Sequence, residues 1–406
     1  MPRVLLFTAS FGSGHNQACK AVKERLQEQG AVVKEVDLVE LFHPAFRWIV
    51  IFLFLQVMKK VPWIYGVFYG FLATSRSKSF VERQLFRLGK RKVLSILESF
   101  RPDVICNTFP TSAGIVSELR ARGMSTVRNV VVITDYTAHG HWVHQNIDLY
   151  CVASDDVRIE LERKGVPAHK ICVTGLPIRK VFNEILEIRD KPVRRRQLRL
   201  KSGMDPDKPL ILIMGGGEGI IGKAKVWESI IRTVDAQFVI VCGQNRKLYK
   251  KLRDLESNHV RVLGYRCDIE QWMAMADVLV TKAGGLTITE AASLGLPMLL
   301  FRPIPGQEHA NACYAVAKGF AQLFDSSTDI QRVIAEMVAR SDKEMGVHAR
   351  MAGRDFLNAS VRVAELLLNP EGASNSMKTV VCQQSYIQRW GGVGLQQYTD
   401  SACEVR

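Results

Sequence analysis

The residues best suited to chemistry follow a short apolar run, Val278-Leu279-Val280, at positions 281–290. Gly284 and Gly285 would let backbone N–H groups approach a diphosphate closely, and a helix starting there would direct its positive end at the anion. Glu290 would lie about one and a half turns into that helix, where its carboxylate can accept hydrogen bonds from ribose hydroxyls. Glycines that only allow tight packing at a helix start are the alternative. The stretch favours a nucleotide-sugar site.

A second glycine-rich motif, Phe11-Gly12-Ser13-Gly14-His15, follows the first apolar run, Val4 to Thr8. Its glycines allow a tight turn, so we expect His15 at the top of a sheet, at the start of a helix and facing a cleft. An imidazole there can act as a general base on a hydroxyl, because its ordinary pKa is near neutral and the helix terminus disfavours its protonated form. A histidine that merely caps the helix is the alternative.

Three histidines and an aspartate are concentrated at positions 134–144. They raise the possibility of a metal site, but their spacing matches no compact zinc pattern, and loops at a cleft commonly collect such residues for substrate contact. We therefore expect no metal. Asp135 is then a second candidate for the base, or the residue that orients His15.

A further polar pair, Gln307 and Glu308, follows the prolines of the segment Pro303 to Gly306. This segment comes directly after the apolar run Met298 to Phe301, so it should lie beside the Gly284-Gly285 turn at the carboxyl ends of neighbouring strands. Both side chains could bind the hydroxyls of a sugar. Prolines followed by a polar pair are also what an ordinary helix start contains.

A nicotinamide enzyme is the obvious rival, because Gly12-x-Gly14 follows a strand and Asp37 lies further along. However, Gln17 occupies the position of the third glycine. The full pattern Gly217 to Gly222 lacks an acidic residue after the next strand, at Cys242 to Asn245. Nor does any Gly-Lys-Ser/Thr sequence indicate a P-loop. The sequence therefore does not support a dinucleotide or P-loop site.

The elements that must position these residues alternate short apolar runs with helical periodicity, which predicts parallel sheets covered on both faces. One series runs to about residue 175, and a second begins at about residue 209. We expect an α/β protein with two doubly wound, Rossmann-like domains that face a central cleft. The predicted divisions are residues 1–175, a polar linker at 176–206, a second domain at 207–345, a closing helix at 346–370 and a disordered tail at 371–406.

Composition describes a globular protein of 406 residues, 47% hydrophobic and 23% charged. The formal net charge of +15 implies an acidic partner: nucleic acid, nucleotide phosphate or an anionic membrane. The nine cysteines are scattered and form no Cys-x-x-Cys pair, which favours free thiols in a reducing compartment. The first apolar run leads straight into a glycine loop, so we expect a buried strand there, not a signal peptide.

The segment Phe46 to Leu72 combines aromatic and aliphatic residues with lysines. Polar residues and Pro62 interrupt it, so it is too short to span a membrane. We predict an interfacial segment that inserts into a membrane surface while its basic residues contact anionic lipid. A buried helical excursion is the alternative. The residues expected at the membrane are Trp48, Phe52, Phe54, Lys59, Lys60, Trp63 and Tyr65.

Taken together, these motifs resemble the bacterial processive diacylglycerol glucosyltransferases and the monogalactosyldiacylglycerol synthases. More distantly, they are similar to the glycosyltransferase that completes the peptidoglycan lipid precursor. The resemblance runs from Val4 to about Leu368 and does not include the tail. Besides the motifs quoted above, it rests on the segments 106–110, 134–136, 142–144, 174–179, 241–245 and 282–285.

This resemblance implies a GT-B fold and an inverting, metal-independent transfer of a hexose from a UDP-sugar to diacylglycerol, without a cofactor. It implies a peripheral enzyme on the cytoplasmic face of the cell membrane, with anionic lipids as partners and no nucleic acid. His15 or Asp135 would take the proton from the acceptor hydroxyl. A related transferase that uses a prenyl-diphosphate-linked sugar, and a non-catalytic module that binds UDP or lipid, are the alternatives. Glucose is favoured over galactose as the transferred sugar.

The resemblance also assigns binding residues in both domains. Those implied for the UDP-sugar are Gly14, Gly215, Gly216, Gly217, Gly243, Asn245, Tyr265, Lys282, Gly284, Gly285, Thr287, Glu290, Gln307 and Glu308. Those implied for the acceptor, in addition to the membrane segment, are Phe109, Trp142 and His144.

Overall fold

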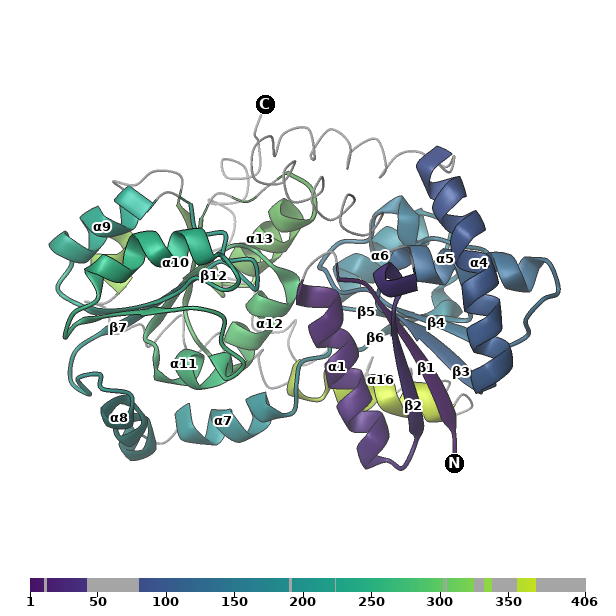
Figure 1. The fold of residues 1–406 in the computed structure, drawn as a ribbon, viewed down its shortest axis with the longest axis horizontal. Coiled ribbons are helices and arrows are strands. Elements are labelled where there is room, and N and C mark those ends of the chain that lie inside the picture. The colour runs from purple at the N-terminus through teal and green to yellow at the C-terminus, as the bar shows by residue number, and fades with distance from the viewer. Residues whose placement is uncertain are drawn as a thin grey trace, which may run out of the picture.

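Two parallel sheets of six strands each form the centres of two α/β units (Figure 1). The computed structural model describes residues 1–10, 13–41, 80–189, 192–222, 224–301, 303, 305–324, 332–337 and 356–369. The predicted membrane residues Trp48 to Tyr65, the first two residues of the Phe11–His15 motif and the tail 371–406 lie outside these ranges. Among the described residues, no helix has the length and apolar character needed to cross a membrane.

The N-terminal sheet has the strand order β2-β1-β3-β4-β5-β6. Its strands are β1 (Arg3–Thr8), β2 (Val32–Asp37), β3 (Val104–Asn107), β4 (Arg128–Val132), β5 (Leu149–Val152) and β6 (Ile171–Val173). Its helices are α1 (Ser13–Glu28), α4 (Phe80–Phe100), α5 (Pro110–Ala121) and α6 (Asp155–Arg163), with short 3-10 turns η1 (Leu38–Leu41), η2 (Gly140–Trp142) and η3 (Ala168–Lys170).

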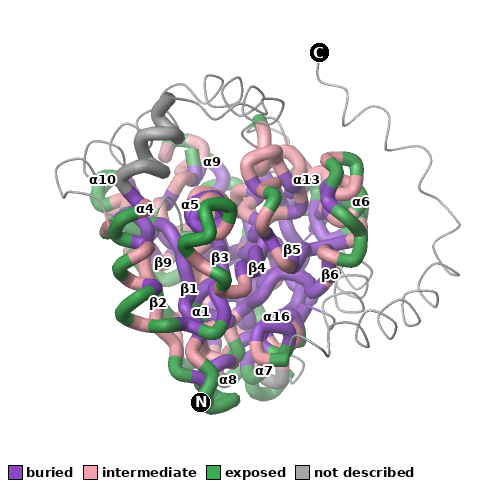
Figure 2. Tube along the Cα trace, turned by 90° about the vertical axis from the view of Figure 1, so that its right-hand side faces the viewer, coloured by how far each residue is buried: buried purple, intermediate pink, exposed green. Residues whose placement is uncertain are grey.

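Both faces of this sheet are covered, which explains why its strands are continuous apolar runs. Val4 and Leu6 of β1 belong to a core cluster with residues of α1, whereas Leu5 and Phe7 belong to a cluster with residues of α4 and α5. Successive side chains of a strand point to opposite faces, so an uninterrupted apolar run is needed to fill both layers. Figure 2 shows the buried inner strands and the more exposed edge at β2.

The C-terminal sheet has the strand order β12-β11-β10-β7-β8-β9. Its strands are β7 (Leu210–Met214), β8 (Gln237–Val241), β9 (Val260–Leu263), β10 (Val278–Thr281), β11 (Met298–Phe301) and β12 (Ala321–Phe324). Its helices are α9 (Ala224–Thr233), α10 (Arg246–Leu252), α11 (Ile269–Met275), α12 (Gly285–Ser293) and α13 (Gln307–Ala317), with the 3-10 turn η4 (Arg253–Leu255). Helices α12 and α13 lie on the side that faces the N-terminal unit (Figure 1).

The strand order reverses direction once in each sheet, and these two points decide where ligands can bind. Strand β1 lies between β2 and β3, and β7 lies between β8 and β10. Loops that leave such neighbouring strands diverge to opposite faces and open a crevice at the carboxyl ends. The Phe11–His15 motif follows β1, and the segments 215–217 and 282–285 follow β7 and β10. The described residues of these motifs, Ser13 to His15, 215–217 and 282–285, therefore lie at the two crevices.

The connection between the units, predicted as a polar linker, contains two helices, α7 (Val181–Arg189) and α8 (Pro192–Lys201). Arg199 of α8 is 5% exposed. It donates to the carbonyl oxygen of Met275 at 3.0 and 2.6 Å and to Asp277 at 2.7 Å. The arginines of this segment thus attach α8 to the C-terminal unit.

The chain returns to the N-terminal unit at its last described helix, α16 (Ala359–Leu368), which lies beside α1 in Figure 1. Arg362 donates to the carbonyl oxygen of Thr174 at 2.6 Å, and Arg128 donates to that of Leu366 at 2.7 Å. Val363 and Leu367 join the apolar cluster of β1 and α1. The end of the predicted closing helix therefore completes the N-terminal core.

Candidate active site

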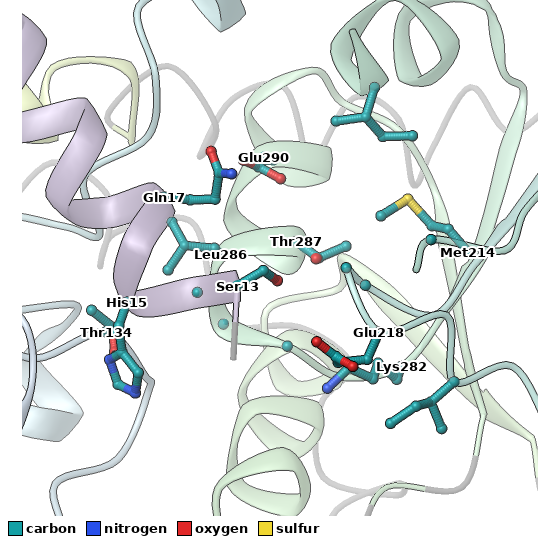
Figure 3. Close-up of a pocket in the computed structure, with 18 of the residues that line it drawn as sticks. Ser13, His15, Gln17, Thr134, Met214, Glu218, Lys282, Leu286, Thr287 and Glu290 are labelled. Atoms are coloured by element: carbon teal, nitrogen blue, oxygen red, sulfur yellow. The ribbon is translucent and has the colours of Figure 1, made fainter. Parts of the chain in front are cut away.

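A cavity of about 310 Å³ opens between the two units, at the carboxyl ends of both sheets. His15 and Asp135 of the N-terminal unit line it, opposite the glycine turns of the C-terminal unit. The predicted residues that line it are Gly14, His15, Asp135, Gly216, Gly217, Gly243, Tyr265, Lys282, Gly284, Gly285, Thr287, Glu290, Gln307 and Glu308. Figure 3 shows His15 beside Thr134, and Thr287, Lys282 and Glu290 contributed by the other unit.

His15 lies in the first turn of α1, directly after the loop that follows β1. Its Nδ1 atom is 3.0 Å from the hydroxyl oxygen of Thr134. Its ring packs edge-on against the ring of Phe109, with the ring centroids 5.2 Å apart. Thr108 donates to the backbone carbonyl of His15 at 3.2 Å. Burial lowers the pKa of His15 below its ordinary value, and the negative charge of Asp135 partly opposes this. The imidazole is therefore neutral near pH 7, the form that can accept a proton.

Asp135 follows β4 but is held by the other unit. Its Oδ1 atom accepts a hydrogen bond from the Asn311 amide at 2.9 Å, and its Oδ2 atom accepts one from the Gln307 amide at 3.2 Å. Burial raises the pKa of Asp135, whereas the hydrogen bond from Asn311 and the charges of His15 and Lys282 lower it. The carboxylate is thus fixed by two amides of α13.

Packing requires two glycines here: Gly219, just after the predicted diphosphate turn at 215–217, and Gly285 of the second predicted turn. Gly219 has φ of 60°, and a Cβ atom there would lie 1.8 Å from the carbonyl oxygen of Cys242. A Cβ atom on Gly285 would lie 2.6 Å from the carbonyl oxygen of Thr134. The first glycine allows the loop after β7 to press against the end of β8. The second allows α12 to approach the loop that carries Asp135.

Two kinds of anion-binding group lie close together where the glycine turns meet. Helix α12 begins at Gly285 with Gly284 as its N-cap, and its first turn contains no acidic residue. Lys282 lies just before this start and forms an ion pair with Glu308 at 2.8 Å. Backbone amides at a helix N-terminus and a nearby ammonium group both stabilise phosphate oxygens. This corner can hold a diphosphate.

Glu290 is the acidic residue on the same helix, and it is only 7% exposed. Burial raises its pKa to about 7, an effect that the charge of Arg179 opposes and that of Glu270 increases. Arg179 and Glu270 form an ion pair at 2.8 Å. Glu290 therefore faces the cavity as a buried acceptor whose charge changes near neutral pH.

Several predicted residues do not line the cavity in the described part of the chain. Asn245 accepts from the backbone N–H of Leu248 at 3.1 Å and donates to the carbonyl of Gly219 at 3.2 Å, so it caps α10 and supports the glycine turn. Gly215, at the start of that turn, does not line the cavity. Phe109 contacts the ring of His15 but does not line the cavity either.

The acceptor assignment of Trp142 is wrong. Its side chain is 0% exposed and belongs to the main hydrophobic cluster, where no lipid can reach it. His144, also predicted for the acceptor, lies with its Nε2 atom 3.3 Å from the carbonyl oxygen of Pro110 and does not line the cavity. In this segment, Trp142 packs in the core beside the site and does not contact the cavity.

The metal hypothesis gains no support from the part of the chain that the structure describes, which holds no group of three His, Cys, Asp or Glu side chains arranged for a metal ion. Burial and the neighbouring His141 instead lower the pKa of His139 to about 3. The absence of a metal in the reaction stays a prediction.

The residues that line the cavity and were not predicted for the site include Gln17, Arg179 and Asn311. Asn311 had a detectable signal, because it lies four residues after Gln307 and so on the same face of the predicted helix. Gln17 follows His15 by two residues. The sequence analysis considered it only as the residue that replaces the third glycine of a dinucleotide-binding pattern. Arg179 lay in a quoted motif without a role.

The fold is of the GT-B type, and the family models that match the chain are those of glycosyltransferases. The structure of MurG from Acinetobacter baumannii is 19% identical and superposes with a TM-score of 0.59, covering 91% of this chain and 99% of that chain. The family model described as "Monogalactosyldiacylglycerol (MGDG) synthase" matches residues 15–178 of this chain. The model described as "Glycosyltransferase family 28 C-terminal domain" matches residues 210–366.

The chain belongs to the processive diacylglycerol β-glucosyltransferase family. It is 31% identical over 388 residues to the processive diacylglycerol β-glucosyltransferase of Bacillus licheniformis, covering 93% of this chain and 97% of the relative. It is 30% identical over 374 residues to the enzyme of the same name from Bacillus subtilis, covering 90% of this chain and 94% of the relative. The protein is thus an enzyme, which rules out the non-catalytic module considered above.

Proposed function

We propose that this enzyme transfers glucose from UDP-glucose to the free hydroxyl of diacylglycerol, with inversion at the anomeric carbon and without a metal ion. The observation that carries the proposal is the pairing of His15 and Asp135 from one unit with a diphosphate-ready helix start from the other in a single cavity. The names of the relatives support the acceptor and the sugar. Their description as processive supports repeated addition of glucose to the first product.

His15 is the better candidate for the base. With the Nδ1 proton donated to Thr134, its Nε2 lone pair is available to the acceptor hydroxyl. Both oxygens of Asp135 already accept amide hydrogen bonds, which suits a carboxylate that stabilises the imidazolium and not one that takes the proton. We therefore assign proton transfer to His15 and charge stabilisation to Asp135.

In the proposed reaction, the acceptor oxygen bonds to C1 of glucose as the bond from C1 to the phosphate oxygen breaks. The hydroxyl proton moves to His15, and UDP leaves with the bonding electron pair. Negative charge then develops on the diphosphate, where the α12 N-terminus and Lys282 stabilise it. Glu290 binds the ribose, and Gln307 with Glu308 binds the sugar.

A single assay tests this proposal. The purified protein is incubated with vesicles that contain diacylglycerol and an anionic phospholipid, in EDTA, with UDP-glucose or UDP-galactose, and the lipids are analysed by mass spectrometry. We expect hexosyl-diacylglycerol with UDP-glucose and a slower or absent reaction with UDP-galactose. Product only with a prenyl-diphosphate-linked sugar would assign the other acceptor class, and a strict need for added Mg²⁺ would refute the metal-independent step.

We propose that the enzyme acts as a peripheral protein at the cytoplasmic face of the membrane. The net charge of +15 supports attraction to anionic lipid, together with the composition of residues 46–72, which lie outside the described residues. Sedimentation with vesicles measures this. Binding to anionic vesicles should weaken as salt increases from about 0.05 to 0.5 M, because the Debye length shortens. Equally strong binding to neutral vesicles would contradict the proposed electrostatic attraction to anionic lipid.

A further inference from the structure

We propose that Asn311 is a positioning residue of the transfer reaction, which holds the Asp135 carboxylate in place beside His15 and ties it to the diphosphate side of the cavity. This inference rests on the proposed function for its kinetic consequence. Its structural part, an amide that links the two units through Asp135, is independent of which sugar or acceptor is used.

The contacts of Asn311 span both units. The side chain lies on α13 and is 1% exposed. Its Oδ1 atom accepts from the backbone N–H of Tyr136 at 2.8 Å. Its Nδ2 atom donates to Oδ1 of Asp135 at 2.9 Å and to the carbonyl oxygen of Ala283 at 3.1 Å. One amide group therefore joins the loop after β4 to the residue that precedes the Gly284-Gly285 helix start.

Neighbouring contacts hold the same loop between α12 and α13. The Tyr136 ring stacks on Tyr314 with centroids 3.9 Å apart, and its hydroxyl lies 2.8 Å from the Thr289 hydroxyl. Gln307, one helical turn before Asn311, binds the second oxygen of Asp135. The position of Asp135 is thus determined by the C-terminal unit, although its chain segment belongs to the N-terminal one.

Only an amide can make this set of bonds, because it presents an acceptor and a donor in one planar group. An aspartate at position 311 has nearly the same shape. It keeps the acceptor for Tyr136 but replaces the donor to Asp135 and to the carbonyl oxygen of Ala283 with a second carboxylate oxygen. Two carboxylates in contact repel each other or share a proton. Asn311→Asp therefore separates the fixing of the loop from the fixing of the carboxylate.

The kinetic consequence follows from the role of Asp135. His15 becomes positively charged when it takes the acceptor proton, and the nearby carboxylate stabilises that charge only at the correct distance. A misplacement of about 1 Å costs about 100-fold in rate. The donor binds to other residues, so its KM should change little.

The experiment uses three variants of the full chain: Asn311→Asp, Asp135→Asn, and the exchange that combines them. Each is measured by kcat and KM for UDP-glucose on diacylglycerol vesicles and by Tm. We expect Asn311→Asp to lower kcat about 100-fold with KM within about threefold, and to lower Tm. In the exchange, the amide introduced at position 135 can again donate to a carboxylate, whereas the bond to Ala283 stays lost, so part of the Tm loss should be recovered while kcat stays low.

A matched control is Asn129→Asp. Asn129 is 0% exposed and lies at the opposite end of β4 from Asp135, where its amide donates to the carbonyl oxygen of Ala113 at 3.3 Å. This variant should lower Tm and leave kcat of the folded enzyme within about twofold, because it touches no cavity residue.

Two outcomes would overturn the inference. An Asn311→Asp enzyme with kcat within about threefold of the wild type would show that the amide does not position a group needed for catalysis. An exchange variant no more stable than additivity of the single changes predicts would show that residues 135 and 311 are not coupled. A wild-type enzyme that forms no glycolipid would refute the proposed function, yet the Tm cycle would still test the link.

Discussion

The two units share one architecture but present opposite chemistry to the cavity between them. Each is a six-stranded parallel sheet whose loops diverge beside its first strand, β1 or β7. The N-terminal loops supply titratable side chains, His15 and Asp135, whereas the C-terminal loops supply glycine turns, a helix start and Lys282. In the proposed reaction, the same crevice geometry serves proton transfer on one side and anion binding on the other, and the loop residues decide which.

The units also differ in how they hold their own residues. Contacts of His15 come from its own unit, through Thr134, Thr108 and Phe109. The hydrogen bonds to the Asp135 carboxylate come from α13 of the other unit. Movement of one unit relative to the other would therefore displace Asp135 from His15. If His15 and Asp135 act as proposed, proton transfer requires the two units to be in contact, and the predictions below test each half of this comparison.

The largest effect is expected at the proton acceptor. His15→Ala should lower kcat by about 100-fold or more, because general base catalysis contributes a factor of that size, while donor affinity and Tm remain near the wild-type values. Steady-state kinetics with UDP-glucose and vesicles, and UDP titration, provide the measurement. His169→Ala, an exposed histidine outside the cavity, is the control and should be fully active. An active His15→Ala enzyme would transfer the base role to Asp135.

The contact between the units is tested by adding one methyl group. Gly285→Ala places a Cβ atom 2.6 Å from the Thr134 carbonyl, so the units must separate, at a cost of about 1–3 kcal/mol in unfolding free energy. At the adjacent Gly284, a Cβ atom would meet the Thr287 hydroxyl at an ordinary 3.8 Å. Calorimetry should show a lower Tm for Gly285→Ala and little change for Gly284→Ala. Equal Tm values for the two variants would contradict the close approach.

Glu290→Gln tests the C-terminal half, with opposite effects on binding and stability. The pKa of Glu290 is about 7 in the folded protein and near 4.5 in the unfolded chain, so its charge destabilises the fold as pH rises through this range. The variant should therefore have a higher Tm than the wild type at pH 8 and an equal Tm near pH 4. Its KM for UDP-glucose should rise about tenfold, through the loss of a charged acceptor for the ribose.

Thermal scans across pH and donor kinetics measure these two effects of Glu290→Gln. Glu98→Gln, an exposed change on α4, serves as the control and should alter neither quantity. A variant whose Tm gain does not depend on pH would show that Glu290 is not the group that titrates.

The smallest effect is expected at Asn245, which supports the glycine turn from behind. Asn245→Ala removes the side-chain cap of α10 and should lower the unfolding free energy by about 1 kcal/mol, with kcat within about twofold of the wild type. Denaturant unfolding and the glycolipid assay measure the two quantities. A large increase in KM for UDP-glucose with unchanged stability would restore the direct donor contact that the sequence analysis predicted.

The two doubly wound α/β units and their cleft were predictable from local patterns, whereas the GT-B assignment and most of the binding residues came from the family resemblance. Short, mostly apolar runs such as Val278–Thr281 favour strands buried on both faces, and their alternation with helices favours parallel sheets. Glycines directly after such strands mark the loops at the carboxyl ends. The prediction of site residues was weakest where the same residue types are found both in a buried core and at a ligand-binding surface. Trp142 is the example, because an aromatic beside polar residues suits both a lipid contact and a core.

The amino-acid sequence by itself determined which loops carry the chemistry, because strand endings, glycine turns and helix starts are properties of neighbouring residues. Tertiary structure alone decided how each group is held and charged. Asn311 and Asp135 are 176 residues apart in the chain, yet one hydrogen bond joins them across the cavity. Burial, which depends on packing by distant segments, lowers the pKa of His15 and raises that of Glu290. Neither effect can be read from local sequence patterns, because desolvation and long-range partners arise only when segments distant in the chain pack together.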